Sequence, residues 1–531
     1  MLSLMRTFSQ SCQGQLGAPL SITCRGKPVA RRELFAYTNG HFLVDEENQF
    51  RRRYVRFDLD ALCSTAALAG EDPSRVTAIE KMEGGFSKAF RMKRANGTEV
   101  IAKIPCRMAG PPSLTTAGEV AVLEYVKKHT SILVPRVFAW SSDSSNPVAA
   151  EYIVMEKAPG VPLFQVWGTM TEFEKLQLIK NLTQLEAQFA KVKFPVPNMP
   201  LDEDIDPSPS FCIGPSCDRA YNPDMTPERN QGPWNSVSDL GLSIAERELY
   251  LISTKGQPRQ LNYYRGTPEQ QSQLLEVTRT VMKLLDSNEV LQKACHPTLW
   301  HTDLHMGNIF VNPDQCSQIV SLIDFQSTTV LPAFPQARWP IFLQPPRNYD
   351  YTRGIFQPQL PEDFDKLGEE SQLIALREWS QVKLAKAYEV STYLEDRAAH
   401  DAMSVPRVFR ELFTRCGEVS EVGIVPLRAC LIEIWENWTS LGFSGECPYS
   451  FSQAERDEHE RQFAEYQAWH EVRMLAEECL DTDAEGWIAP QVDIDEKRRQ
   501  NDELLALYIE KVTGERSTKE AQAMWPFFPG P

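Results

Sequence analysis

The chain has 531 residues, which at about 150 residues per domain is enough for two to four domains. Hydrophobic residues make up 42% of it and aromatic residues 10%, a composition that excludes a disordered protein. The net charge is -17, from 72 acidic and 55 basic side chains. This balance argues against a nucleic-acid-binding protein, because such a protein needs a basic surface to neutralise phosphates.

Cysteine usage argues against a disulfide-rich or zinc-stabilised protein, and hydropathy argues against a transmembrane protein. The 12 cysteines are scattered, and "CIGPSC", with Cys212 and Cys217, is the only close pair. We therefore expect reduced thiols that pack as small apolar groups, and neither a disulfide framework nor a structural zinc site. No apolar run approaches the ~20 residues that span a bilayer, so we expect no transmembrane segment.

The first residues differ in charge from the rest of the chain. Residues 1–32 contain no Asp or Glu, are rich in Ser, Thr and Gln, and carry Arg6, Arg25, Lys27, Arg31 and Arg32. Mitochondrial presequences are basic and acid-poor in this way, whereas the alternative is a plain disordered tail. We expect residues 1–40 to be a mitochondrial presequence, which implies a mitochondrial location and recognition by the import machinery.

A strand-rich segment follows an N-terminal extension at 41–75, and we expect it to form an N-lobe over 76–158. "VTAIEKMEGGFSKAFRMKRANGTEVIAKIP" predicts three strands, separated by a glycine turn and by the hairpin turn Asn96-Gly97. "SLTTAGEVAVLEYVKKHT" then has helical spacing, and we expect its buried face to be Ala121, Val122, Tyr125 and Val126. "VPRVFAW" and "EYIVMEKAPG" predict two more strands.

Helical patterns dominate from residue 159 onward. Met170–Val192 and Thr267–Ala294 are amphipathic, whereas residues 195–234 contain nine prolines and predict a loop insertion. We expect a mainly helical C-lobe over 159–400 and further helices over 401–531 that pack on it.

A dense polar cluster lies in the second half of the chain, in "PTLWHTDLHMGNIFVNPD". Apolar residues flank it, and the strand "QIVSLIDFQ" follows, so the two strands predict a hairpin. Such a hairpin would bring Asp303, Asn308 and Asp324 to the same end. Carboxylate and amide oxygens suit a hard cation such as Mg2+.

A zinc metallohydrolase is an alternative for the same cluster. In a strand, His301, Asp303 and His305 would lie on one side, and zinc binds such ligands. The chain has only eight histidines, however, and no second cluster supplies further imidazoles.

The motif "HTDLHMGN" and the later "IDF" resemble the catalytic and metal-binding segments of the aminoglycoside phosphotransferase-like group. The spacing of His301, Asp303, Asn308 and Asp324 matches the kinase template. Upstream, "EGGFSKAF", "VIAKIP" and "TTAGEVAVLEYV" resemble the glycine loop, the strand lysine and the helix glutamate. "RRELFAYTNGHFLVDEENQFRRRYVRFDLDAL" is similar to the fungal family named altered inheritance of mitochondria protein 9, and this likeness covers nearly the whole chain.

The resemblance implies an α+β, protein-kinase-like two-lobe fold. Its N-lobe would be small and β-rich with one helix, and its larger C-lobe mainly helical with extra C-terminal helices. It also implies ATP- and Mg2+-dependent transfer of a phosphoryl group to a hydroxyl of a small molecule. Gln326 stands where a protein kinase has glycine, which favours a small-molecule acceptor over a protein.

The same resemblance implies roles for individual residues. Asp303 would orient or deprotonate the acceptor hydroxyl, His301 would support the loop, and His305 could touch the transferred phosphoryl group. Asn308 and Asp324 would bind the metal. The nucleotide would be contacted by the glycine turn, the strand lysine held by its glutamate, and the hinge Met155–Ala158, which together comprise Gly84, Gly85, Phe86, Ser87, Lys103, Glu119, Glu156 and Ala158. A nucleotide-binding interaction protein that performs no transfer is the remaining alternative.

Overall fold

The computed structural model describes residues 20–191, 211–221, 230–254, 263–326, 328–346, 349, 354 and 356–528. Contacts divide them into two compact units. The sheet unit comprises the described residues up to Asn39, together with Phe50–Arg107 and Arg136–Lys157. The helical unit comprises Gly40–Gln49, Met108–Pro135 and the described residues from Ala158 onward. None of the helices in these ranges combines the length and the hydropathy that a membrane span requires.

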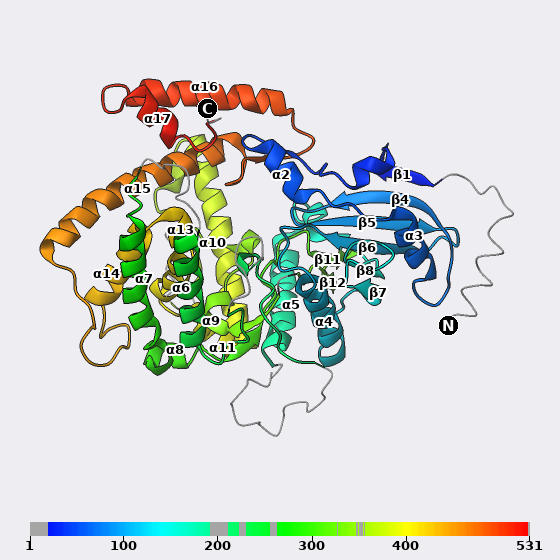
Figure 1. Cartoon of the computed structure of the whole chain (residues 1–531), viewed down its shortest axis with the longest axis horizontal. Coiled ribbons are helices and arrows are strands. Elements are labelled where there is room, and N and C mark those ends of the chain that lie inside the picture. Colours follow the sequence, from blue (N-terminus) through cyan, green and yellow to red (C-terminus); the bar gives the residue numbers. More distant parts are fainter. Residues whose placement is uncertain are drawn as a thin grey trace. The chain divides into compact units, whose positions relative to one another are not determined.

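A seven-stranded sheet forms the sheet unit (Figure 1). Its strand order is β2-β1-β4-β5-β6-β8-β7, in which β1 and β4 are parallel and all other neighbours antiparallel. The strands are β1 Ser21–Cys24, β2 Lys27–Pro28, β4 Val76–Glu83, β5 Ser87–Arg94, β6 Glu99–Pro105, β7 Val137–Ser141 and β8 Tyr152–Glu156. The strands predicted over 76–158 and the turns between them are confirmed.

The core of the sheet unit lies between this sheet and helix α3 (Leu59–Leu68). Alternate residues of β5 and β6, such as Phe90 and Ala102, are fully buried, as the two-residue period of a strand requires. Leu62 is fully buried on the facing side of α3. Asp58 caps the helix, since its side chain accepts a hydrogen bond from the Ala61 N–H at 2.9 Å.

Part of the predicted presequence belongs to the sheet. Residues 1–19 lie outside the described residues, but β1 pairs with β4 from Ser21 opposite Ala78 to Cys24 opposite Lys81. The Arg31 guanidinium forms an ion pair with Asp60 at 2.9 Å. Removing residues 1–40 would therefore remove two strands of the sheet.

Helix α4 (Leu114–His129) buries a different face from the predicted one. Of the four residues expected in that face, only Val126 is buried, and Ala121 is exposed. The buried stripe includes Glu119, together with Leu123. The prediction was wrong because the buried stripe contains the carboxylate of Glu119, so the sequence pattern marks this face as polar. Contacts also assign α4 to the helical unit, although its sequence lies within the segment expected to form the N-lobe.

The polar motif leads into a hairpin of the helical unit, as predicted. Strands β11 (Ile309–Asn312) and β12 (Gln315–Leu322) are antiparallel, and β9 (Val161–Pro162) adds a third strand next to β11. Helix α5 (Glu172–Lys191) packs on β12, where Asn181 Nδ2 donates to the Ser317 carbonyl at 2.7 Å.

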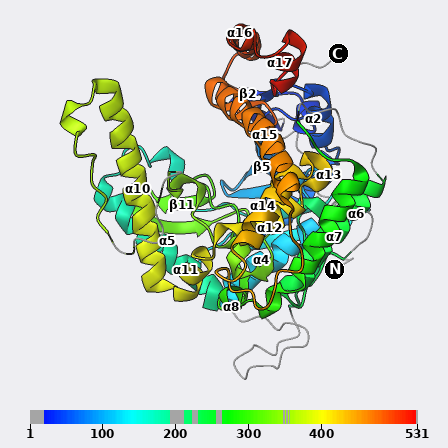
Figure 2. The same ribbon diagram turned by 90° about the vertical axis from the view of Figure 1, so that its left-hand side faces the viewer.

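Helix α10 (Glu369–Glu395) runs beside α5 (Figure 2). The hydroxyls of Thr183 and Ser391 lie 2.6 Å apart between the two helices. Tyr388 donates its hydroxyl to Glu186 at 2.9 Å, and burial raises the pKa of this carboxyl to about 8. The long α10 therefore supports the helix on which the hairpin rests.

The other helices of the helical unit are α6 Val237–Thr254, α7 Pro268–Met282, α8 Glu289–Gln292, α9 Ala333–Gln336, α11 Arg397–Met403, α12 Arg407–Cys416, α13 Val419–Val422, α14 Val425–Glu436, α15 Gln453–Leu480, α16 Ile494–Val512 and α17 Thr518–Met524. Two short strand pairs complete it, β10 (Pro297–Leu299) with β13 (Val330–Pro332) and β3 (His41–Phe42) with β14 (Trp487–Ile488). Helix α2 (Glu46–Arg53) spans the division between the units. Residues 195–210 and 222–229 of the predicted insertion lie outside the described residues.

Gly160 is required where β9 begins. Its φ is +82°, and an added Cβ would lie 2.3 Å from the Val311 carbonyl oxygen on β11. We expect Gly160→Ala to destabilise the protein by more than the ~1–2 kcal/mol that a left-handed backbone alone costs. Gly445→Ala is the control, because Gly445 has a φ of +73° but no atom within 4 Å of its added Cβ. Urea unfolding measures both, and equal losses would refute the role of the β9–β11 contact.

Candidate active site

The loop between β10 and β11 is anchored by the imidazole of His301. This side chain is 3% exposed, and its Nε2 lies 3.0 Å from the carbonyl oxygen of Ile323. Its Nδ1 accepts a hydrogen bond from the Asp303 N–H at 3.3 Å. Burial lowers the pKa of His301, and this pattern fits a neutral ring that carries its proton on Nε2. These two hydrogen bonds place His301 where it can support the loop, and its role there stays a prediction.

The carbonyl oxygen of Asp303 closes the loop. It accepts one hydrogen bond from the His305 N–H at 3.0 Å and another from Asn308 Nδ2 at 2.9 Å. The carboxylate of Asp303 is exposed, whereas Asn308 is 5% exposed. Because the amide nitrogen of Asn308 is used in this bond, its amide oxygen is the atom that can face a ligand.

Asp324 follows β12 and has an unusual backbone. Its φ is +64°, in the left-handed region that Asp and Asn tolerate better than other non-glycine residues. The preceding Ile323 N–H donates to the Asn308 carbonyl at 3.1 Å, which ties this segment to the loop. The next residue, Phe325, is buried, and its ring centroid is 4.6 Å from that of His301. These contacts join the segments that carry Asp303, Asn308 and Asp324.

His305 is exposed and is held by its own loop. Its Nδ1 accepts a hydrogen bond from the Gly307 N–H at 3.0 Å. An added Cβ at Gly307 would lie 2.7 Å from Cε1 of this ring, so a side chain there would displace it. No local sequence pattern indicates this role for Gly307, because the contact depends on the turn of the loop.

The predicted glycine turn lies in the sheet unit, between β4 and β5. The Gly84 N–H donates to the Ser87 carbonyl at 3.1 Å, and the Phe86 carbonyl accepts from the Cys106 N–H at 2.8 Å. An added Cβ at Gly84 or Gly85 would meet no atom within 4 Å, and neither glycine has a left-handed φ. The fold itself thus does not require glycine here, whereas close approach of a ligand to the backbone would.

The other predicted nucleotide contacts fall in both units. Lys103 on β6 is 6% exposed and pairs across the sheet with Ala89 and Ile153. Glu156 ends β8, is exposed, and accepts the Arg136 N–H at 3.3 Å. Glu119 and Ala158 belong to the helical unit and are buried, at 4% and 7% exposure. The pairing of Lys103 with Glu119 stays a prediction.

The zinc alternative finds no support in the geometry of the histidines. Both ring nitrogens of His301 are occupied by backbone groups, as described above. His305 Nδ1 is likewise bonded to a backbone N–H. The described part of the chain contains no group of three or more His, Cys, Asp or Glu side chains able to hold a metal ion. Asp324 and the Asn308 amide oxygen are instead hard oxygen donors of the kind that Mg2+ accepts.

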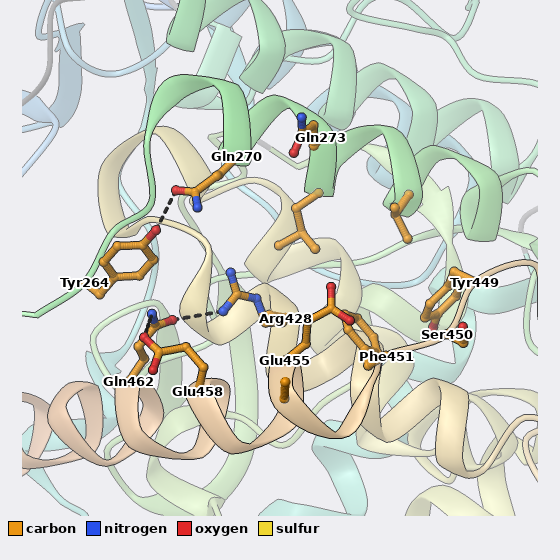
Figure 3. Close-up of a pocket in the computed structure, with 13 residues that line it drawn as sticks. Tyr264, Gln270, Gln273, Arg428, Tyr449, Ser450, Phe451, Glu455, Glu458 and Gln462 are labelled. Atoms are coloured by element: carbon orange, nitrogen blue, oxygen red, sulfur yellow. Dashed lines mark hydrogen bonds between the residues drawn. The ribbon is translucent and has the colours of Figure 1, made fainter.

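A separate pocket of about 590 Å³ lies in the helical unit (Figure 3). Helices α7, α14 and α15 line it, with the Arg428 guanidinium donating to Gln462 Oε1 at 2.9 Å and Tyr264 donating to Gln270 at 2.5 Å. Glu458 on the same wall is bound by Arg461 at 2.7 Å. None of the residues predicted for catalysis lines this pocket.

Comparison with known proteins places the motifs in a family. A family model described as "Phosphotransferase enzyme family" matches residues 78–334, the region that holds all the predicted site residues. A subtelomeric hrmA-associated cluster protein of Aspergillus fumigatus is 30% identical over 468 residues, covering 77% of this chain and 88% of its own. The mitochondrial altered inheritance of mitochondria protein 9 of Clavispora lusitaniae is 22% identical over 387 residues, covering 60% of this chain and 63% of that relative.

Solved structures of phosphotransferases are also similar to this chain. The streptomycin–ATP complex of an aminoglycoside phosphotransferase has a TM-score of 0.34 at 14% identity, and covers 73% of this chain and 100% of that one. A macrolide 2'-phosphotransferase from Brachybacterium faecium has a TM-score of 0.30 at 12% identity, with 70% and 96% covered.

The chain has a β-rich N-terminal part and a mainly helical C-terminal part, and the phosphotransferase family model spans both. The chain belongs to the phosphotransferase enzyme family.

A buried histidine next to the pocket predicts a pH dependence of stability. His459 is 6% exposed, and burial together with Arg428 lowers its pKa from 6.5 to about 4. Between these values the unfolded chain binds a proton that the folded chain does not, so stability falls as the pH falls from 6.5 to about 4. We expect His459→Gln to lose less stability than wild type over this interval in urea unfolding. Parallel losses in both proteins would contradict the assignment.

Proposed function

We propose that this protein is a phosphotransferase that uses ATP and Mg2+ to phosphorylate a hydroxyl of a small molecule. The observation that supports this most directly is the loop of His301, Asp303 and Asn308, joined through Ile323 to Asp324. The carboxylate of Asp303 is exposed, Asn308 is buried, and Asp324 has a left-handed backbone. The sequence match to the phosphotransferase family covers this loop completely.

Asp303 is the residue to which we assign the acceptor hydroxyl. Its carboxylate is exposed, while its backbone N–H donates to His301 and its carbonyl accepts from His305 and Asn308. A side chain held in this way can orient the hydroxyl and accept its proton without first reorganising the loop. His305 lies two residues further and would contact the transferred group.

Asn308 and Asp324 would hold Mg2+. When bound, the ion neutralises phosphate charge, and ATP supplies the phosphoryl group. In the sheet unit, Lys103 would bind phosphate oxygens, and the backbone of Gly84–Ser87 would approach them. Glu119 would hold Lys103, and the hinge with Glu156 and Ala158 would contact adenine. A nucleotide-binding protein without transfer would use the same sheet-unit groups but would need no Asp303.

Asp303→Asn tests this function directly. We expect it to lower kcat for ATP-dependent phosphorylation by about 10²–10⁴-fold, because the amide cannot accept the proton. Binding of Mg·ATP, measured by calorimetry, should persist. Asp314→Asn is the control, since Asp314 is an exposed carboxylate at the turn of the same hairpin. A screen of hydroxylated metabolites supplies the acceptor, and turnover unchanged in Asp303→Asn would refute the assignment of the base.

We also propose that the protein acts in mitochondria and is recognised by the import machinery. Support comes from the acid-free N-terminal residues and from the mitochondrial relatives, such as that of Clavispora lusitaniae. Because β1 begins at Ser21, a removable presequence would end before that residue.

Import of the radiolabelled chain into isolated mitochondria tests this location. We expect protease protection of the full chain that depends on the membrane potential. A chain that starts at Leu20 should not be protected, since it retains β1 but lacks the proposed signal. Equal protection of both chains would contradict a signal within residues 1–19.

A further inference from the structure

Three buried cationic side chains lie around the base of the glycine turn. Lys81 is 3% exposed, Lys88 0% and Arg53 2%. Buried charges of this kind are costly unless each has hydrogen-bond partners. Their hydrogen-bond partners come largely from residues 33–39 and from the turn itself. The three side chains therefore connect the turn to residues 33–39.

Glu83, the residue directly before Gly84, is the centre of this network. Its carboxylate lies 2.5 Å from Lys88 Nζ and 3.1 Å from Lys81 Nζ. The same carboxylate accepts the N–H of Thr38 at 2.8 Å and the Thr38 hydroxyl at 3.1 Å. The start of the glycine turn is therefore tied to Thr38, 45 residues earlier in the chain.

The lysines bind the same segment through its backbone. Lys81 donates to the carbonyl oxygens of Glu33 at 2.8 Å and Ala36 at 2.6 Å, and to the Thr38 hydroxyl at 3.0 Å. Lys88 donates to the Ala36 carbonyl at 2.8 Å. All three protons of the Lys81 ammonium can thus be satisfied, which explains how it remains buried.

Arg53 acts on the middle of the turn. Its Nε donates to the carbonyl oxygen of Gly85 at 3.1 Å, and its guanidinium lies over the ring of Tyr37 at 5.3 Å. In a trans peptide the C=O of one residue and the N–H of the next point in opposite directions. By fixing the Gly85 carbonyl, Arg53 also fixes the direction of the Phe86 N–H.

Charge in this network favours an anion at the turn. Lys81, Lys88 and Arg53 carry three positive charges, and Glu83 carries one negative charge. The thiol of Cys106 lies within electrostatic reach of all four groups, and burial raises its pKa to about 11, so it adds no negative charge at neutral pH. Charges in a region of low dielectric act over longer distances than charges in water.

We propose that Arg53 and the contacts between Thr38 and Glu83 form a brace that positions the glycine turn for phosphate binding. Arg53 is then a positioning residue, supplied by a segment outside the family match at 78–334. The phosphate part of this proposal rests on the proposed function. The restraint of the turn does not, because it follows from the contacts within the sheet unit.

Arg53→Met is the main test, with Arg94→Met as a matched control. Arg94 is 6% exposed, and its Nη1 donates to the Ala69 carbonyl at 2.5 Å at the other end of β5. We expect Arg53→Met to speed amide hydrogen exchange in a peptide covering 83–88 and to weaken Mg·ATP binding by about tenfold, the value of one charged hydrogen bond. Arg94→Met should leave both unchanged where both variants are folded. Arg53→Lys, which keeps the charge, should restore part of the affinity.

Thr38→Val provides a milder second variant if Arg53→Met does not fold. It removes the hydroxyl that Glu83 and Lys81 bind, and should speed exchange at 83–88 in the same way. Unchanged exchange at the turn in both variants would overturn the brace. Faster exchange with unchanged Mg·ATP affinity would overturn its role in phosphate binding. Failure of the wild-type protein to bind Mg·ATP would instead refute the proposed function and leave the exchange result standing.

Discussion

The hydrogen bond between the buried imidazole of His301 and the carbonyl of Ile323 joins the two segments on which the candidate chemistry depends. Ile323 also donates its N–H to Asn308, so both of its backbone groups bind the loop. Asp324 comes next, in a left-handed conformation. A charged imidazole could not accept the Asp303 N–H, and burial favours the neutral ring that can. The relative positions of Asp303, Asn308 and Asp324 therefore depend on a histidine that need not contact any reacting atom.

In the sheet unit, buried charged side chains likewise join two segments through their hydrogen bonds. Burying an ammonium costs several kcal/mol unless its protons are bonded, and Lys81 meets this condition with two carbonyls and a hydroxyl. The segment that supplies these acceptors and the sheet that supplies the lysines therefore stabilise each other. Removing either partner would leave polar groups buried without their hydrogen bonds.

The features that could be predicted from the sequence are those whose residues lie close together in the chain. The hairpin, the glycine turn and the Asn96-Gly97 turn follow from local patterns, and all are present. The motif from His301 to Asp324 was found because its spacing is short and specific. The buried face of α4 was assigned wrongly because Glu119 is buried within it, and no local pattern distinguishes a buried carboxylate from a solvated one.

Contacts between distant residues were not predictable. Arg53 meets Gly85 32 residues away, Arg338 donates to the Thr302 carbonyl 36 residues away, and Thr183 meets Ser391 208 residues away. Each of these side chains is of a type that is usually solvent-exposed, so its sequence context suggests a surface position. Only the folded chain shows that they hold the turn, the loop and helix α5.

In the N-terminal segment, the local composition and the contacts with distant residues point to different roles. Its basic composition between residues 20 and 32 is that of a targeting signal, yet Arg25 donates to the Thr38 carbonyl at 2.8 Å and Arg31 binds Asp60. A segment that supplies acceptors to two buried lysines cannot be removed without exposing or neutralising them. Residues 20–39 are therefore part of the folded sheet unit. The glycine turn, though it lies inside the family region, depends for its support on this earlier part of the chain.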